Sequence, residues 1–255
     1  MPGLLHTAEE GTPSRLYAAI AAEFVCSFLF AFIGAAAPSS SAAAANGIAL
    51  AVLAYVSANV SGGHLNPAVT VATLATGHTS VSRGLAYIVA QIAGCTLAAG
   101  MHLLLIPNAH DVGCFAPNGI SLGQAFGWEA IMTFLLVVTI YSVAVGKPDF
   151  GVMGPLAIGL ALFAAALTGG SFTGAALNPA RVLGPALVFG CGWRAAPVYI
   201  LAELLGGVAG SVISWPLYGT GLQFGRWFDA VEDAVADARQ ALRGGYDRVT
   251  GEAHA

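Results

Sequence analysis

The residues best suited to chemistry are two copies of the tripeptide Asn-Pro-Ala, each preceded by a glycine-containing run. The copies are Asn66-Pro67-Ala68 and Asn178-Pro179-Ala180. Asn is a preferred helix N-cap and Pro is favoured at the first helical position, so each copy predicts the start of a helix. The apolar stretches that follow, 68–76 and 180–189, are about half as long as the roughly 20 residues that cross a bilayer. The sequence therefore predicts two half-helices that enter a membrane and turn back.

Two half-helices that meet tip to tip would gather hydrogen-bond donors at the centre of the membrane. Each N-terminus presents unpaired N–H groups and the positive end of its dipole, and Asn66 and Asn178 add amide donors. A neutral solute accepts these hydrogen bonds, whereas a cation meets two positive ends. Non-helical backbone, expected over 61–65 and 168–177, survives at this depth only inside protein or along a wet cavity. The pattern favours a pore, with a plugged bundle as the alternative.

The composition restricts the class of protein further. The chain has 255 residues, of which 57% are hydrophobic and 9% charged, whereas a soluble domain has about 25% charged residues. A multi-span membrane protein without a cleavable signal peptide is expected. Nine basic residues spread along the chain give no nucleic-acid footprint. No phosphate-binding loop, metal-ligand cluster or nucleophile–base pair is found in the sequence, so we expect neither an enzyme nor a cofactor, and passive transport.

Six longer apolar runs are predicted to span the membrane. They cover 17–37, 42–60, 84–106, 124–145, 151–167 and 195–219. The pattern Glu23-x-x-x-Ser27-Phe28 in the first run is matched by Glu129-x-x-x-Thr133-Phe134 in the fourth. Three spans repeated once require the second copy to insert upside down. We expect a cytosolic segment 1–16, a channel domain 17–219 with repeats at about 17–106 and 124–219, and a cytosolic tail 220–255.

Two Asn-Pro-Ala boxes in an internally repeated membrane chain, the second followed by Arg181, resemble the aquaporin (major intrinsic protein) family. The resemblance runs over about residues 17–219. It implies an all-α membrane fold with six transmembrane helices and two re-entrant half-helices in an inverted 3+3 repeat. It also implies a channel for water in the lipid bilayer and a homotetramer with one pore per subunit.

The resemblance also places a selectivity filter at four positions: Asn46, Ala166, Ala175 and Arg181. Three of these side chains are smaller than those of strict water channels, so we expect a wide ring that passes ammonia, urea or hydrogen peroxide as well as water. Arg181 supplies a fixed cation that repels other cations. Val182 stands where glycerol facilitators carry Asp, and the chain looks closest to vacuolar (tonoplast-like) or bacterial water channels. A broader glycerol facilitator and a poorly conducting junctional protein stay as alternatives.

Several other polar residues have predicted roles. Glu23 and Glu129 are expected to accept N–H groups of the re-entrant loops, and His64 to brace the first loop. His110, in the long connection 107–123, is either a modulator at the pore mouth or an ordinary solvated residue. Glu203 departs from the family pattern, with an interfacial site, a subunit contact or a pore role as alternatives. A Cys114–Cys191 disulfide is conceivable, because both residues fall on the same outer side.

The orientation follows from basic residues near the ends of the spans. One side carries Arg15, Arg83, Lys147 and Arg226. Both termini are therefore expected to face the cytoplasm, with the protein in a plasma or vacuolar membrane. Apolar residues spaced by three and four positions predict an amphipathic helix over 224–243 in the tail.

Overall fold

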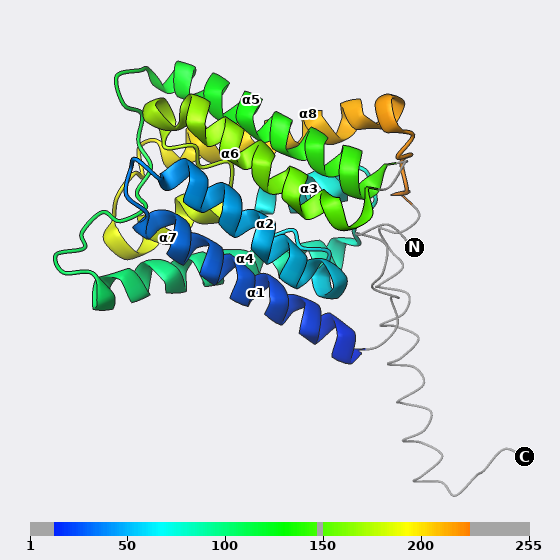
Figure 1. Ribbon diagram of the computed structural model, residues 1–255, viewed down its shortest axis with the longest axis horizontal. Helices are drawn as coiled ribbons and strands as arrows, with labels where there is room; N and C mark the ends of the chain where they lie inside the picture. Colours follow the sequence, from blue (N-terminus) through cyan, green and yellow to red (C-terminus); the bar gives the residue numbers. More distant parts are fainter. Residues whose placement is uncertain (1–12, 147–149, 225–255) are drawn as a thin grey trace, which may run out of the picture.

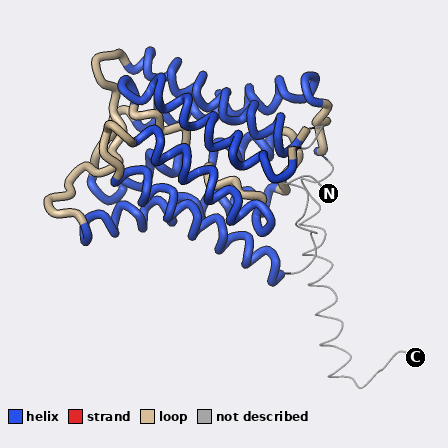
Figure 2. Tube along the Cα trace, in the orientation of Figure 1, coloured by secondary structure: helices blue, strands red, loops and turns tan. Residues whose placement is uncertain are grey.

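The computed structural model describes residues 13–146 and 150–224. Every regular element within these ranges is a helix, and the loops gather mainly at the two ends of the bundle (Figure 2). The elements are α1 Pro13–Ala36, α2 Ala42–Ser61, α3 Pro67–Ala75, α4 Val81–Leu105, α5 Leu122–Ile140, the π-helical turn η1 Tyr141–Val145, the 3-10 turn η2 Gly151–Met153, α6 Gly154–Thr173, α7 Pro179–Phe189 and α8 Ala196–Tyr218.

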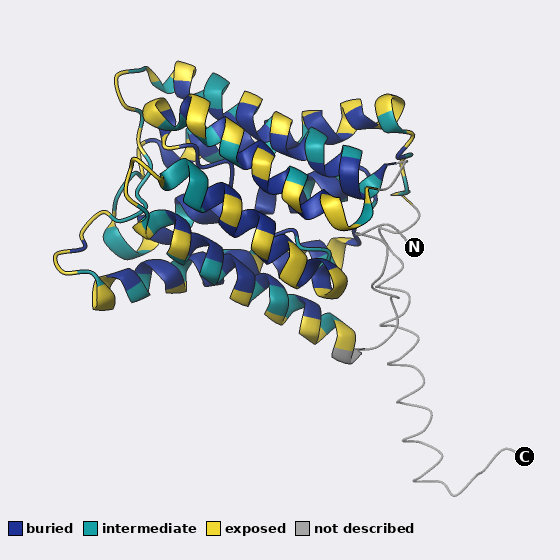
Figure 3. Ribbon diagram, in the orientation of Figure 1, coloured by how far each residue is buried: buried dark blue, intermediate teal, exposed yellow. Residues whose placement is uncertain are grey.

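Six of these helices are long and apolar enough to cross a membrane, within the described part of the chain. They are α1, α2, α4, α6, α8 and the continuous segment Leu122–Val145, which agrees with the six predicted spans. Their outward faces carry exposed aliphatic side chains, and the faces toward the middle are buried (Figure 3). An apolar surface of this extent is unfavourable in water, so it is expected to contact the hydrocarbon of a bilayer.

The two half-helices are shorter, with α3 spanning 9 residues and α7 spanning 11. The long helices pack in pairs. Helix α1 lies along α4 in the first half of the chain, as α5 lies along α8 in the second half, and α2 packs on α6 across the two halves. Each half-helix packs on a long helix of the other half of the chain, α3 on α8 and α7 on α4. The half-helices occupy opposite ends of the bundle (Figure 1). This exchange makes the two halves one body.

Glycines let the paired helices come close. An added Cβ on Gly94 would press on the Phe24 carbonyl, and one on Gly206 would press on the Ala130 carbonyl. The two contacts occupy equivalent places in the pairs α1–α4 and α5–α8. Small residues at such crossings are the usual way for membrane helices to gain contact area.

The helix before the second box extends further than the sequence analysis predicts. We expected the fifth span to end at 167 and the backbone to be irregular over 168–177, but α6 continues to Thr173. The polar residues and glycines of this turn predict the end of a helix. In the structure, Gly169 packs against Met132, and the Thr168 hydroxyl donates to the Ala164 carbonyl within the helix. Tertiary packing therefore overrides the local signal. The first loop is likewise shorter, because α2 includes Ser61.

One end of the bundle is closed by contacts between the turn after α3 and the segment after α8. Gln223 donates its N–H to the Thr76 carbonyl at 2.9 Å, and His78 Nε2 lies 3.2 Å from the Thr220 carbonyl. The predicted tail helix, apart from its first residue, falls outside the described residues, as does Lys147.

The close glycine contact in the pair α1–α4 gives a stability prediction. Gly94→Ala is expected to destabilise the protein by about 1–3 kcal/mol, because the added methyl group overpacks against backbone that has no room to move. The readout is thermal unfolding of the detergent-solubilised protein.

Gly100, in the same helix, is the matched control because a Cβ there would meet open space. Gly100→Ala should hold or raise the unfolding temperature, since Ala is favoured over Gly in helices by roughly 0.5–1 kcal/mol. Equal losses in both variants would contradict the packing argument.

Candidate pore site

The loops that lead into the two half-helices share one unusual backbone conformation. Gly62 and Gly174 end α2 and α6 with φ of 91° and 84°, and Leu65 and Leu177 have φ of 51° and 50°. The left-handed region is unfavourable for a residue with a Cβ, at roughly 1–2 kcal/mol. Ala175 adds a third such non-glycine residue, with φ of 50°. These loops therefore need strong external partners to keep their shape.

Two buried carboxylates supply those partners. Glu23 Oε1 accepts the His64 N–H at 2.9 Å, and its Oε2 accepts the Leu65 N–H at 2.7 Å. In the second half, Glu129 Oε1 accepts the Ala176 N–H at 3.1 Å and Oε2 accepts the Leu177 N–H at 2.9 Å. Neither carboxylate is exposed to solvent. Each one neutralises two backbone donors that would otherwise be unpaired at membrane depth.

The two asparagines cap their own half-helices and also tie the loops together. Asn66 Oδ1 accepts the Ala68 N–H at 2.8 Å, and Asn178 Oδ1 accepts the Ala180 N–H at 3.0 Å. Asn66 Nδ2 donates to the Leu177 carbonyl at 2.6 Å, while Asn178 Nδ2 donates to the Leu65 carbonyl at 2.9 Å. A side-chain amide carries two N–H groups. One N–H of each asparagine therefore remains available to a solute.

Both asparagines line one cavity between the helices. The polar part of its wall comes from the two loops, and the rest is aliphatic or aromatic. The lining residues are Phe30, Leu50, Gly62, Gly63, His64, Leu65, Asn66, Val69, Leu136, Ile140, Ala144, Ile158, Leu162, Ala176, Leu177 and Asn178. The cavity therefore offers a few hydrogen-bonding groups on an otherwise apolar wall.

Arg181 lies in the first turn of α7, directly after the second Asn-Pro-Ala box. Its Nη1 donates to the Ala176 carbonyl at 3.2 Å and to the Ala175 carbonyl at 3.4 Å. The guanidinium lies between two aromatic rings, 5.1 Å from the centroid of Phe30 and 5.3 Å from that of Phe115. Cation–π contacts of this kind stabilise both the position and the positive charge of the group.

Two of the four predicted filter positions, Ala175 and Arg181, are in direct contact. Arg181 bonds to the carbonyl of Ala175, but neither Asn46 nor Ala166 lines the cavity that contains the asparagines or the one beside Arg181. Asn46 donates to the carbonyls of Gly34 and Ala42, at 3.2 and 2.8 Å, and so joins α2 to α1. Ala166 packs against the apolar core.

Sequence reasoning missed the two aromatic residues that contact Arg181. Phe30 lies two helical turns after Glu23 on α1, a spacing that puts both on one helix face and was available as a signal. Phe115 had no such signal, since it lies in the long connection between α4 and α5. Its ring reaches Arg181 only because of how that loop folds back.

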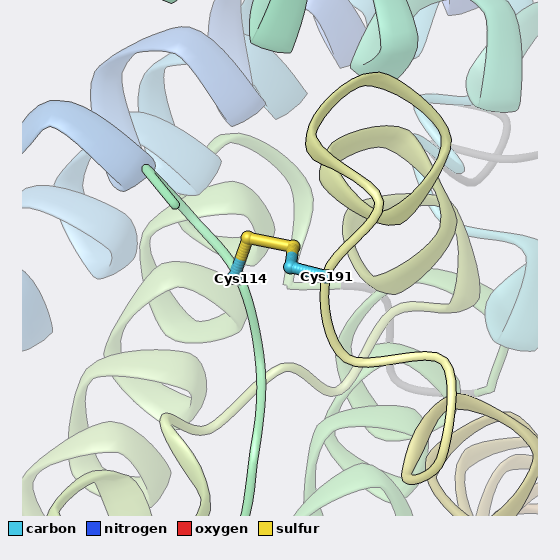
Figure 4. The surroundings of a disulfide bond; sticks show 2 residues. All are labelled: Cys114 and Cys191. Atoms are coloured by element: carbon cyan, nitrogen blue, oxygen red, sulfur yellow. A yellow bond between two sulfur atoms is a disulfide. The ribbon is translucent and has the colours of Figure 1, made fainter. Parts of the chain in front are cut away.

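A disulfide between Cys114 and Cys191 holds this loop against the end of α7 (Figure 4). The bond selects one of the alternatives left open by the sequence, and it joins residues 77 apart with their Cα atoms 6.0 Å apart. Its neighbour Phe115 lies against Gly174 and Gly192, where a larger residue would clash with it. The anchor at Cys114 therefore brings Phe115 to the arginine. His110, predicted as one alternative to lie at the pore mouth, is exposed on the same loop.

His64 is buried and lines the cavity, and its Nδ1 lies 3.1 Å from Thr70 Oγ1. Its ring also packs edge-on against Tyr87, with centroids 5.3 Å apart. The side chain thus connects the first loop to α3 and α4. Its second-half counterpart in the loop is Ala176, so the bracing differs between the two loops.

Removal of the disulfide gives a second prediction. Cys114→Ser and Cys191→Ser should each lower the free energy of unfolding by about 2–4 kcal/mol, because the closed loop no longer restricts the unfolded chain. The double variant should lose no more than either single variant. Thermal unfolding in detergent measures both.

Reductant provides the control. It should lower the unfolding temperature of the unmodified protein to that of the variants and leave the variants unchanged, since the remaining cysteines, Cys26 and Cys95, are free and buried. A reductant effect of the same size on the double variant would contradict the assignment.

Comparison with known proteins fits this geometry. Residues 10–214 match the model of the family described as major intrinsic protein. A probable aquaporin TIP-type of Medicago truncatula is 40% identical over 227 residues, covering 81% of this chain and 89% of the relative. Aquaporin TIP1-1 of Zea mays is 39% identical over 219 residues, covering 79% of this chain and 86% of the relative.

A solved structure gives the same fold at lower identity. The aquaglyceroporin from Plasmodium falciparum superimposes with a TM-score of 0.69 at 24% identity, covering 78% of this chain and 95% of that one. The family match covers most of the chain and the relatives agree with it over nearly their whole length. The chain belongs to the major intrinsic protein family, the family of the aquaporins, and is therefore a membrane channel protein and not an enzyme.

Proposed function

We propose that the protein is a passive channel for water whose path runs past Arg181 and between Asn66 and Asn178. The observation that carries the proposal is the cavity lined by both asparagines, in which two half-helix tips are tied to each other by hydrogen bonds. The names of the relatives, which are aquaporins, support it. No energy source is needed for such a path.

Proton and cation exclusion is proposed on electrostatic grounds. The N-termini of α3 and α7 point their positive dipole ends at the region between the asparagines. A water there accepts N–H groups from Asn66 and Asn178 with its oxygen, so both of its hydrogens turn away along the file. This orientation interrupts proton hopping, and the fixed charge of Arg181 adds a barrier for other cations.

Small neutral solutes such as ammonia, urea and hydrogen peroxide are proposed to share the path. The wide ring inferred from Asn46 and Ala166 is not the basis for this, because the two residues lie outside the cavity walls described above. The basis is the largely apolar wall, which does not compete with water for hydrogen bonds. Phe30 and Phe115 beside Arg181 set the size limit, so glycerol should pass less readily than urea.

The orientation and assembly are also proposals. Arg15 and Arg83 lie at the end where α1 and α4 begin, whereas Arg194 and the disulfide lie at the other end. The positive-inside rule places the first end in the cytoplasm, and a disulfide fits the oxidising side. We propose cytoplasmic termini, a plasma or vacuolar membrane and a homotetramer, the last from the family resemblance alone.

The channel proposal predicts rapid osmotic shrinkage of proteoliposomes. After a step made with an impermeant sugar, light scattering should change much faster than for empty liposomes. After a step made with urea, shrinkage should be followed by reswelling, while glycerol should give slower reswelling. Rates equal to those of empty liposomes would contradict an open water path, and absent reswelling in urea would restrict the path to water.

The role of Arg181 predicts a change in selectivity. Arg181→Val should increase the entry of protons, measured with a pH-sensitive dye inside the liposomes, because the fixed positive charge and its donors are removed. Arg194→Val is the matched control, since Arg194 is exposed at the same end of the bundle. Equal proton entry in the two variants would contradict the proposed barrier.

A further inference from the structure

The two halves of the chain match at positions beyond the boxes. The run Tyr87-x-x-Ala90-Gln91-x-x-Gly94 in α4 has the same spacing as Tyr199-x-x-Ala202-Glu203-x-x-Gly206 in α8. The tyrosines of the two runs make equivalent hydrogen bonds in the structure. Tyr87 donates its hydroxyl to the carbonyl of Ser61, the last residue of α2, at 2.9 Å, and Tyr199 does the same for Thr173, the last residue of α6, at 3.0 Å. Glu203 is therefore the counterpart of Gln91.

Gln91 supports the carboxylate of the first loop. Its Nε2 donates to Glu23 Oε2 at 2.7 Å and to Thr70 Oγ1 at 3.0 Å. Glu203 occupies the equivalent place in the second half. The first half therefore has an amide donor beside Glu23, whereas the second half has a carboxyl group beside Glu129. Gly94 lies against the carbonyl of Phe24, the residue after Glu23, and Gly206 lies against the carbonyl of Ala130, the residue after Glu129. This matched packing turns Glu203 toward Glu129 as Gln91 is turned toward Glu23.

Glu203 has no exposed surface, and neither of its oxygens accepts a hydrogen bond from any donor among the described residues. The subunit contact considered in the sequence analysis is therefore wrong, because the side chain lies inside its own bundle. The backbone N–H of Asn178 is directed at the carboxyl without reaching hydrogen-bond geometry. A buried charge left in this state would cost several kcal/mol.

The charged groups around Glu203 do not neutralise it. Glu129 approaches from α5 and Arg181 from α7, while α3, which also packs on α8, carries no ionisable side chain. Tyr199 precedes Glu203 by one turn on α8 itself. Arg181 directs its Nη1 to two loop carbonyls and lies between two aromatic rings. The local balance is two carboxyl groups and one cation.

Two carboxyl groups in one buried site are not both ionised, because repulsion and lost hydration act together. We propose that Glu203 keeps its proton and that its O–H donates a hydrogen bond to Glu129, as Nε2 of Gln91 donates one to Glu23. Glu203 is thus a positioning residue for the second Asn-Pro-Ala box, acting through the carboxylate that holds the loop. One proton shared by the pair replaces the amide hydrogen of the first half.

This arrangement makes the second loop sensitive to alkali in a way the first is not. As pH rises, the shared proton leaves the pair for solvent, and two carboxylates then repel each other beside Ala176 and Leu177. The stabilising contribution is present while the proton is bound and is lost when it leaves, so permeability should fall toward alkaline pH. This consequence rests on the proposed water channel, because it is read out as water flow.

The test compares the pH profile of water permeability in proteoliposomes for the unmodified protein and Glu203→Gln. The unmodified protein should lose permeability as pH is raised above neutral. Glu203→Gln should be permeable and keep a flat profile, because its amide donates at every pH. Histidines and other titratable groups are common to both proteins, so the difference belongs to position 203. Identical profiles would overturn the proposal.

A swap variant moves the effect to the other loop. In the Glu203→Gln background, Gln91→Glu places the same pair beside Glu23, and the alkaline loss of permeability should return. A flat profile in the double variant, with water flow intact, would overturn the claim that a carboxyl pair is the cause.

A second readout separates this inference from the channel proposal. Infrared spectra of the unmodified protein at neutral pH should contain the absorption of a protonated carboxyl in an apolar setting, and Glu203→Gln should lack it. If no water flows at any pH but this band is present and lost in the variant, the channel proposal fails and the proton assignment stands. Absence of the band in the unmodified protein would overturn the assignment.

Discussion

The structure depends on the hydrogen bonds between two buried carboxylates and the backbone of the two re-entrant loops. Without Glu23 and Glu129, four N–H groups would be unpaired at membrane depth, in a region where no lipid can accept a hydrogen bond. The loops also contain leucines and an alanine in the left-handed region, so they have little stability of their own. The carboxylates make a strained, polar segment compatible with an apolar interior.

Much of the fold could be predicted because it depends on local chemistry. An Asn followed by Pro starts a helix in water or lipid alike, and runs of about 20 apolar residues have few alternatives to spanning. The placement of Glu23 and Glu129 in matching patterns was also readable, since both lie one span away from a loop that needs acceptors. The end of α6 at Thr173 was not, because Gly169 packs against Met132 and does not stop the helix.

The wall around Arg181 was the least predictable part of the site. Spacing from the asparagines pointed to Asn46, but its Nδ2 donates to two helix carbonyls, and the one on α1 is within reach only because of how α1 and α2 cross. Phe115 comes from a loop whose path is set by a disulfide with a residue 77 positions away. Such contacts join segments that are remote in sequence, and the local sequence pattern does not show that these segments lie close together in space.

The cross-bonds between the boxes have a consequence for biosynthesis. Asn66 donates to Leu177 and Asn178 donates to Leu65, so each loop is completed by atoms of the other. The first loop leaves the ribosome more than a hundred residues before its partner, as the positions of Asn66 and Leu177 require. During that interval α3 lacks both its partner loop and the helix α8 on which it packs. The first half-helix is therefore expected to remain at the insertion machinery or the membrane surface, and to reach its final packing only after the second half has been synthesised.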